Sequence, residues 1–219
     1  MVALAPDDPR LRSKHFENAT AIFANNDVKY DSNKTRARLF AAQTNSGIVY
    51  SVARDTPSQD ALRERPGISA DKVKWLQRHD RECGYLYGML PLIENMPMAL
   101  TDHIDRSPDK MLLRGKIGYL HSWVLREDDE SVAEHGVRRL QHLPLVVFVK
   151  YPNATWTLPG LTEPGLYPIV PRASSWWLDK NRKHPKLKIT RQQLPLAPAF
   201  SITTHASQGQ TLVLSLIHI

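Results

Sequence analysis

A short polar turn near the C-terminal end of the chain holds the side chains best suited to chemistry. Its members are Thr204, His205, Ser207, Gln208 and Gly209. Hydroxyls, an imidazole and the backbone N–H groups of a glycine-containing turn can all donate hydrogen bonds to a phosphate, and glycine lets the backbone approach an anion closely. A β-prone run that includes Phe200 and Ile202 leads into the turn. The turn is therefore a candidate phosphate site. The alternative is a strand-to-helix turn whose polar residues cap the backbone from Gln210 onward.

A second candidate region lies near the start of the chain, where residues 19–24 are expected to form a short buried strand. Asn25, Asn26 and Asp27 follow and are good helix N-caps, so a helix is expected to run to Ala42. Strand, polar turn and helix together are the unit of an α/β sheet. Open α/β sheets place ligands at the carboxyl ends of their strands, so Asn25 and Asn26 could contact nucleic acid or nucleotide. Simple N-capping is the equal alternative.

Helix residues Arg36 and Arg38 could reach a triphosphate shared between two domains, as arginine fingers do. A solvated helix face is the alternative for both. Between the helix and residue 112 we expect a strand at 48–53, a loop at 54–70, a short helix at about 71–81, and a hairpin formed by 85–92 and 98–101.

From residue 113 onward the pattern changes to short β runs separated by prolines and charged loops. The runs are 116–125, 145–151, 155–158, 166–170 and 187–190. Short strands at this density indicate a small barrel, and its place between two α/β-type segments indicates an insertion. The tryptophans of this region, Trp123, Trp156, Trp176 and Trp177, could stack on bases, although most are expected in the barrel core.

Composition limits the classes of partner and compartment. The chain of 219 residues has a formal net charge of +7 and a pI near 9.6, which favours a polyanionic partner. The loop from Lys180 to Lys188 carries five of the positive charges and could contact nucleic acid, although such loops are usually solvated. A single cysteine, Cys83, and the lack of a long apolar run favour a reducing compartment, nucleus or cytoplasm, with no membrane contact.

Three stretches, taken in order, resemble the C-terminal half of the Pif-type and Helitron-encoded superfamily 1 DNA helicases, relatives of RecD. Residues 19–28, with Asn33 following, are similar to the strand and "T-N-x-x-V" that open the second RecA-like domain of that family. Residues 90–100 and 114–118 are similar to its "L-x-L-x-x-G-x-P-V-M-L … N-G-x-x-G". Residues 193–212 match "Q-x-P-L-x-x-A-[YW]-x-x-T-I-H-K-[SA]-Q-G-x-T-L" in order and spacing.

The resemblance implies an α/β fold, with a partial RecA-like parallel sheet and an inserted Src-homology-3-type β-barrel. The implied divisions are a lead-in at 1–18, the second RecA-like domain at 19–112 and 191–219, and the barrel at 113–190. By position in the motif, Thr204, His205, Ser207, Gln208 and Gly209 would bind single-stranded DNA together with Asn25 and Asn26. Gln208, Gly209 and Arg36 would face ATP.

The sequence also departs from the family pattern. Ala206 stands where a basic residue is usual, Asn95 replaces a glycine, and Arg114 replaces an asparagine. No Gly-x-x-x-x-Gly-Lys-[Ser/Thr] loop occurs, so ATP and Mg²⁺ are expected to bind chiefly to an N-terminal RecA-like domain that is not in this sequence. We therefore expect no catalytic residue here and a helicase fragment inactive alone. The alternatives are a non-enzymatic nucleic-acid-binding barrel module and a decayed mobile-element remnant.

Overall fold

The first element of the fold is the expected strand, turn and helix. The structure, a computed structural model, describes residues 20–203 and the strand at 215–218. Strand β1 (Thr20–Phe23) leads through Asn25 into helix α2 (Asn26–Gln43). Asn25 has extended backbone angles, and its side chain accepts a hydrogen bond of 2.7 Å from the Asp27 N–H, which caps the helix. The prediction for this unit is confirmed.

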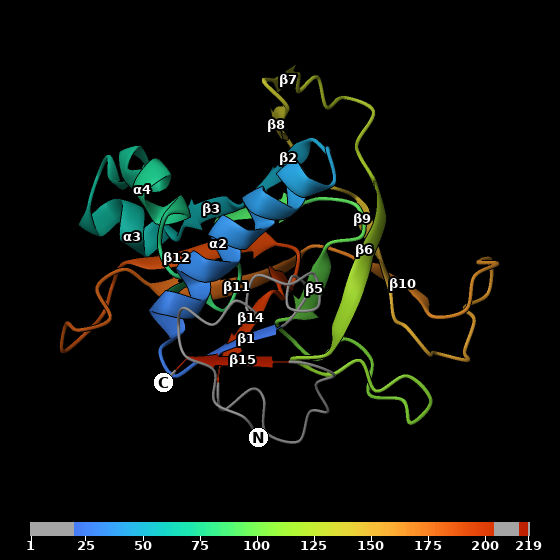
Figure 1. Ribbon diagram of the computed structural model, residues 1–219. Coiled ribbons are helices and arrows are strands. Elements are labelled where there is room, and N and C mark those ends of the chain that lie inside the picture. The colour runs from blue at the N-terminus through green and yellow to red at the C-terminus, as the bar shows by residue number, and fades with distance from the viewer. Residues whose placement is uncertain (1–19, 204–214, 219) are drawn as a thin grey trace.

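Strand β1 lies in the middle of a small parallel sheet whose order is β14-β1-β15. Strand β14 (Ser201–Thr203) and strand β15 (Ser215–His218) both run parallel to β1. Helix α2 packs against β1 and β14, as Figure 1 shows. The buried residues of the helix are spaced three and four apart, which gives the helix one inward face; they are Tyr30, Asn33, Ala37 and Ala41.

The largest sheet is antiparallel, with the order β10-β9-β6-β5-β13. Its strands are β5 (Pro97–Leu100), β6 (Ile117–Val124), β9 (Val146–Lys150), β10 (Leu166–Ile169) and β13 (Leu196–Pro198). β13 leads directly into β14, so this sheet is continuous in sequence with the parallel one. The main hydrophobic core joins the inward face of α2 to buried residues of this sheet.

Two smaller sheets complete the fold. One has the order β11-β12-β3, with β11 at Arg172–Trp177, β12 at Lys188–Gln193 and β3 at Arg54–Pro57. The other has the order β4-β2-β8-β7, with β4 at Met89–Leu92, β2 at Ile48–Val52, β8 at Val137–Arg139 and β7 at Ala133–Glu134. Short helices α3 (Gln59–Glu64) and α4 (Lys72–Leu76) and the 3₁₀ turns η2 (Ile68–Asp71) and η3 (Asp80–Cys83) lie in the segment between β3 and β4.

Several sequence-based expectations are wrong. The predicted loop at 54–70 contains β3 and α3, and the expected helix at 71–81 is the shorter α4 followed by a 3₁₀ turn. The expected hairpin does not form, because β4 pairs with β2 while β5 pairs with β6 and β13. Residues 155–158 are not a strand, whereas β11 was not foreseen.

The part of the chain that the structure describes is mixed α/β with several open sheets and no closed barrel. Strands from 113–190 share sheets with strands outside that range: β6 pairs with β5, β12 with β3, and β8 with β2. The same three strands also pair with strands inside that range, β6 with β9, β12 with β11 and β8 with β7. The division into a RecA-like domain and an inserted barrel therefore stays a prediction.

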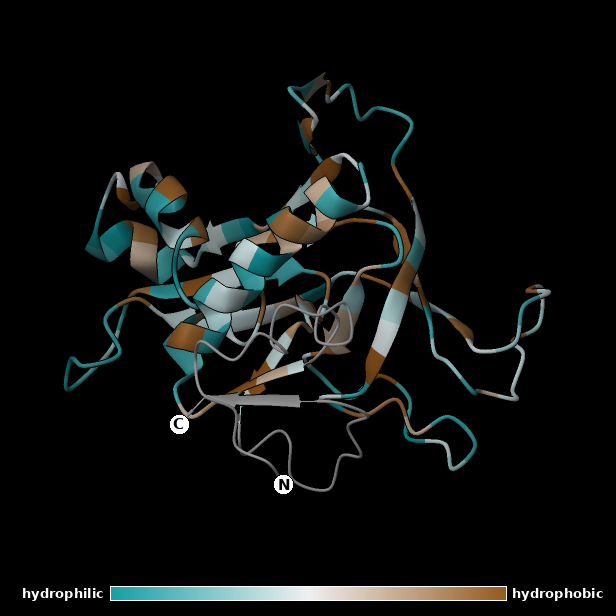
Figure 2. Ribbon diagram, in the orientation of Figure 1, coloured by the Kyte–Doolittle hydropathy of each residue, from teal (hydrophilic) through white to brown (hydrophobic). Residues whose placement is uncertain are grey.

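Figure 2 shows the loop between β11 and β12, at the lower left, as almost wholly hydrophilic. A second buried cluster lies beneath the short helices and contains Ile68, Trp75, Cys83, Trp176 and Ile189. Within the described ranges, no helix combines the length and apolar character that a bilayer crossing requires.

Candidate functional site

The helix α2 residue Asn33 binds the backbone of strand β14 on the edge that faces away from β1. The Ser201 N–H donates to Asn33 Oδ1 at 2.8 Å, and Asn33 Nδ2 donates to the Ser201 carbonyl at 3.2 Å. Asn33 is 1% exposed, so these bonds satisfy polar groups that would otherwise be buried without partners. The Ser32 and Ser201 hydroxyls also lie 2.8 Å apart. The first and third stretches of the helicase resemblance are thus joined by side-chain contacts.

Arg36 lies one turn further along α2 and contacts the same segment. Its Nη1 donates to the Phe200 carbonyl at 3.2 Å, and its guanidinium lies 5.6 Å from the Phe200 ring centroid. Burial lowers the pKa of Arg36 from its ordinary value. These contacts hold the chain just before β14. A role of Arg36 in ATP binding stays a prediction, as does one for Arg38, which is exposed.

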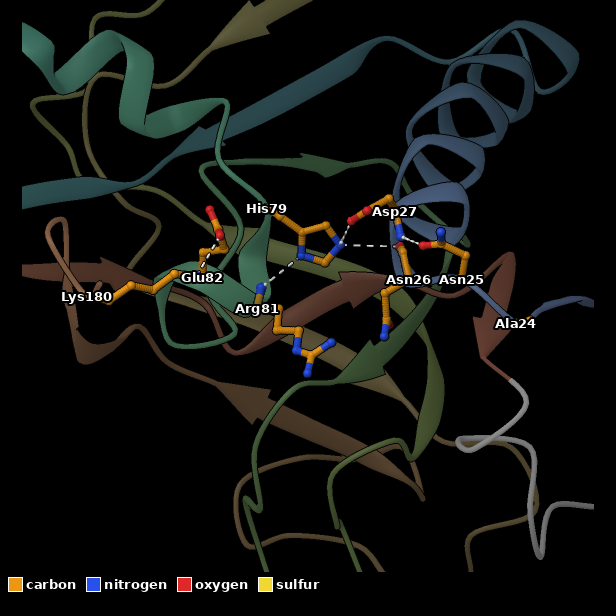
Figure 3. Close-up of a pocket in the computed structure, with 8 residues that line it drawn as sticks. All are labelled: Ala24, Asn25, Asn26, Asp27, His79, Arg81, Glu82 and Lys180. Carbon is orange, nitrogen blue, oxygen red and sulfur yellow. Dashed lines mark hydrogen bonds and ion pairs between the residues drawn. The ribbon is translucent and has the colours of Figure 1, made fainter. Parts of the chain in front are cut away.

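A polar cavity of about 680 Å³ lies where β1 ends and α2 begins. Figure 3 shows the residues that line it: Ala24, Asn25, Asn26, Asp27, His79, Arg81, Glu82 and Lys180. Asn25 serves as the helix N-cap here, so the capping interpretation has direct support. The Asn26 side chain points away from His79 in this view (Figure 3). DNA contact by Asn25 and Asn26 stays a prediction.

His79 links the 3₁₀ turn η3 to the first turn of α2. Its Nδ1 accepts a hydrogen bond from the Arg81 N–H at 3.1 Å and lies 2.7 Å from Asp80 Oδ1. On the other side of the ring, Nε2 lies 3.3 Å from the Asn26 carbonyl and 3.7 Å from Asp27 Oδ1. The ring also stacks on Tyr30, with 4.6 Å between centroids. His79 therefore fixes one wall of the cavity.

Burial, followed by the nearby charge of Asp80, raises the pKa of the Tyr30 hydroxyl well above its ordinary value. Tyr30 thus stays neutral beside the cavity. Sequence reasoning missed His79 and Arg81 as parts of this cavity. No spacing signal could have found them, because more than fifty residues separate them from Asn26 in the chain.

The phosphate-binding candidates of the C-terminal turn, namely Thr204, His205, Ser207, Gln208 and Gly209, lie outside the described residues. Strand β14 ends at Thr203, directly before them in sequence. Their proposed roles accordingly stay predictions.

The basic loop between β11 and β12 is engaged with carboxylates of the same chain. Lys180 Nζ lies 2.8 Å from Glu82, while Arg182 and Lys186 lie 2.7 and 3.0 Å from the two oxygens of Glu64. Hydrogen bonds from Arg182 and Lys186 lower the pKa of Glu64. This loop is therefore less available to phosphates than its sequence indicates. Of the tryptophans weighed for base stacking, Trp176 is buried and Trp177 is exposed.

Across residues 20–203, no three His, Cys, Asp or Glu side chains come together in a way that could hold a metal ion.

Comparison with known proteins finds no matching family model and no matching curated sequence. Solved structures do match. The Pif1 helicase from Candida albicans matches with a TM-score of 0.52 and 16% identity, covering 91% of this chain and 38% of that one. Bacteroides Pif1 bound to ssDNA matches with a TM-score of 0.50 and 18% identity, covering 92% of this chain and 34% of that one. The described chain has a Pif1-like helicase fold.

A further Pif1 match is the structure from Bacteroides sp. in complex with ADP-AlF4, with a TM-score of 0.47 and 17% identity over 97% of this chain and 36% of that one. The chain spans only about a third of the length of the Candida albicans Pif1 and of the Bacteroides Pif1 bound to ssDNA.

The backbone conformation explains how asparagine can stand at position 95, where the resembling family carries glycine. Asn95 has a φ of 62°, the left-handed region that glycine adopts freely. Asparagine tolerates this region better than most other residues. Asn95 can therefore occupy the turn before β5 where the resembling family carries glycine.

Proposed function

We propose that this chain is part of an ATP-dependent DNA helicase, in which it supplies the grip on single-stranded DNA and one wall of the ATP cleft. The observation that carries the proposal is the pair of hydrogen bonds between Asn33 and Ser201. They bring the strand–helix unit of the first resembling stretch against strand β14, which belongs to the third. The likeness of fold to a Pif1 bound to ssDNA supports the same function.

In this proposal Thr204, His205, Ser207, Gln208 and Gly209 contact the phosphates of the DNA strand. Asn25 and Asn26 extend the contact at the carboxyl end of β1, and Arg36, Gln208 and Gly209 face the nucleotide. ATP and Mg²⁺ bind mainly to an N-terminal RecA-like partner domain. The second RecA-like domain then comprises 19–112 and 191–219, and 113–190 forms the inserted unit. These assignments rest on the motif resemblance.

The test is fluorescence anisotropy with a labelled oligothymidine, together with a measurement of ATP turnover. We expect the purified chain to bind the oligonucleotide with an affinity that falls as salt rises, because bound cations displace counterions from the phosphates. Substituting His205 and Gln208 with alanine is expected to weaken binding. Turnover is expected to stay near background with or without DNA, and robust DNA-stimulated hydrolysis would contradict the assignment of ATP to a partner domain.

The rival function is a nucleic-acid-binding module that acts through the basic loop from Lys180 to Lys188. The ion pairs of that loop with Glu64 and Glu82 count against it. Neutralising the loop to glutamine separates the two functions. If DNA binding is abolished by that change and untouched by the His205 and Gln208 substitutions, the rival is the better account.

A further inference from the structure

A second, smaller cleft shares no lining residue with the cavity at the start of α2. It has a volume of about 210 Å³ and is formed where five separate segments meet. They are the turn before β4, the end of β5, the turn before β6, β11, and the turn between β12 and β13. The polar and aromatic side chains that line it are Tyr85, Thr101, Asp102, Arg114, Arg172 and Ser174.

Tyr85 is held in an unusual conformation at the mouth of this cleft. Its φ is 63°, a left-handed value that is uncommon for an aromatic residue, and its side chain is 39% exposed. The preceding Gly84, with φ of 67°, approaches β11 so closely that a Cβ there would lie 2.1 Å from Ser174 Oγ. The packing of the turn against β11 thus presents the Tyr85 ring to solvent.

Arg114 covers the Tyr85 ring. Its guanidinium carbon lies 3.8 Å from the ring centroid, which is the separation of a stacked pair. Arg114 is exposed and forms no ion pair with any residue that the structure describes. Arg172, on the same cleft, donates to Asp102 Oδ2 at 2.9 Å and to the His103 carbonyl at 3.2 Å. The lining therefore carries one uncompensated positive charge.

One hydroxyl in the cleft lacks a partner. Thr101 Oγ1 is buried and has no hydrogen-bond partner among residues 20–203. A buried hydroxyl without a partner is unfavourable, and a ligand with acceptor oxygens would satisfy it.

We propose that this cleft binds one nucleotide of a single-stranded nucleic acid. The base stacks on the Arg114–Tyr85 pair, as bases stack on guanidinium planes and aromatic rings in single-strand binders. The phosphate accepts a hydrogen bond from Arg114, and one from the Thr101 hydroxyl once that side chain rotates from its buried position towards the cleft. The inference rests on the proposed function, because it adds a second contact to the same strand that the C-terminal turn would hold.

The experiment uses the full chain and an oligothymidine carrying 5-iodouracil, which cross-links to adjacent aromatic side chains on irradiation. We expect a cross-link to Tyr85, mapped by mass spectrometry. Arg114→Ala is expected to weaken binding about tenfold and to reduce the salt slope by about one. Arg114→Lys keeps the positive charge, so it should retain the dependence of affinity on salt concentration. It should lose most of the affinity gained from stacking. Arg126→Ala is the matched control, because it removes the same charge from an exposed site paired with Asp128.

Two results overturn the inference. If Arg114→Ala binds as tightly as Arg126→Ala and Tyr85 is not labelled, while alanine at His205 still weakens binding, the cleft is not a nucleotide site and the proposed function survives. If the unaltered chain binds no single strand at all, the proposed function fails and this inference fails with it. Melting curves check that all three arginine variants are folded.

Discussion

The guanidinium of Arg191 and the carboxylate of Asp55 face each other through two hydrogen bonds of 2.8 and 2.7 Å. Both side chains are almost wholly buried, at 0% and 1% exposure. The two residues are register partners on β12 and β3, and Arg191 also donates to the Leu86 and Trp75 carbonyls. This arginine thereby ties the sheet to the short helices and to the turn before β4.

Removing one member of this pair should be strongly destabilising. We expect Arg191→Ala to lower the free energy of unfolding by about 3–5 kcal/mol, because Asp55 would be left charged and buried. Urea denaturation followed by tryptophan fluorescence measures the change, since Trp75 and Trp176 pack nearby. Arg182→Ala, which breaks an exposed ion pair with Glu64, should cost far less, because water screens that pair. Similar losses for the two variants would contradict the structural role given to Arg191.

The bonds between Asn33 and Ser201 can be tested by graded substitution. Asn33→Ala leaves the Ser201 N–H and carbonyl buried without partners, so we expect a loss of about 1–3 kcal/mol in unfolding free energy. Ser32→Ala removes only a contact between hydroxyls and should cost less. Hydrogen exchange at the Ser201 amide gives a local readout. Exchange that is no faster in Asn33→Ala than in Ser32→Ala would show that the bond does not protect this strand.

The buried thiol of Cys83 predicts a decline of stability at high pH. Burial raises the pKa of Cys83 to about 11 from its ordinary value of 9.0. The folded chain therefore holds the thiol proton more tightly than the unfolded chain, and its contribution to stability is full below pH 9 and is lost as pH rises towards 11. Thermal melts across this range should show a falling melting temperature.

Buried tyrosines, whose pKa values are also raised, add to the decline, so the matched comparison is Cys83→Ala. The variant should lose less stability than the unaltered chain between pH 9 and 10. The same burial predicts that iodoacetamide labels the native thiol slowly at pH 8 and labels it rapidly in urea. Fast labelling of the native chain would contradict the burial of Cys83.

Glu64 forms ion pairs with the basic loop, so removing the Glu64 carboxylate is predicted to strengthen DNA binding. Glu64→Gln releases Arg182 and Lys186 from their carboxylate, so we expect tighter, strongly salt-dependent binding to oligothymidine. Glu127→Gln changes the net charge equally in an acidic loop elsewhere and serves as the control. Equal effects of the two substitutions would indicate that only net charge matters.

Local signals in the sequence were sufficient for the first part of the fold. Asn25 as a cap and the spacing of Ala37 and Ala41 define β1 and α2 without reference to distant residues. The predicted hairpin of 85–92 and 98–101 does not form, because the pairing of its strands depends on distant residues. Met98 pairs with Gly118 and Pro198 rather than with β4. Partners of that kind are set by packing of the whole chain.

The same limit applies to the candidate sites. The charges of the basic loop are visible in the sequence, whereas their partners Glu64 and Glu82 are contributed by α3 and η3. His79 reaches the start of α2 only through the fold. The motif resemblance assigned the regions around Asn33 and Ser201 to the same domain, without predicting a contact between them. Their contact is present, while the phosphate-binding turn itself lies outside the described residues.

The order of the parallel sheet has a consequence for the folding pathway. Strand β1 sits between β14 and β15, so Ala21 pairs with Ser201 on one side and with Leu216 on the other. Both neighbours of β1 lie far from it along the chain, so each pairing closes a long loop. Loop-closure entropy delays such pairings, so the antiparallel sheet is expected to assemble first and the parallel sheet to close as the slow final step.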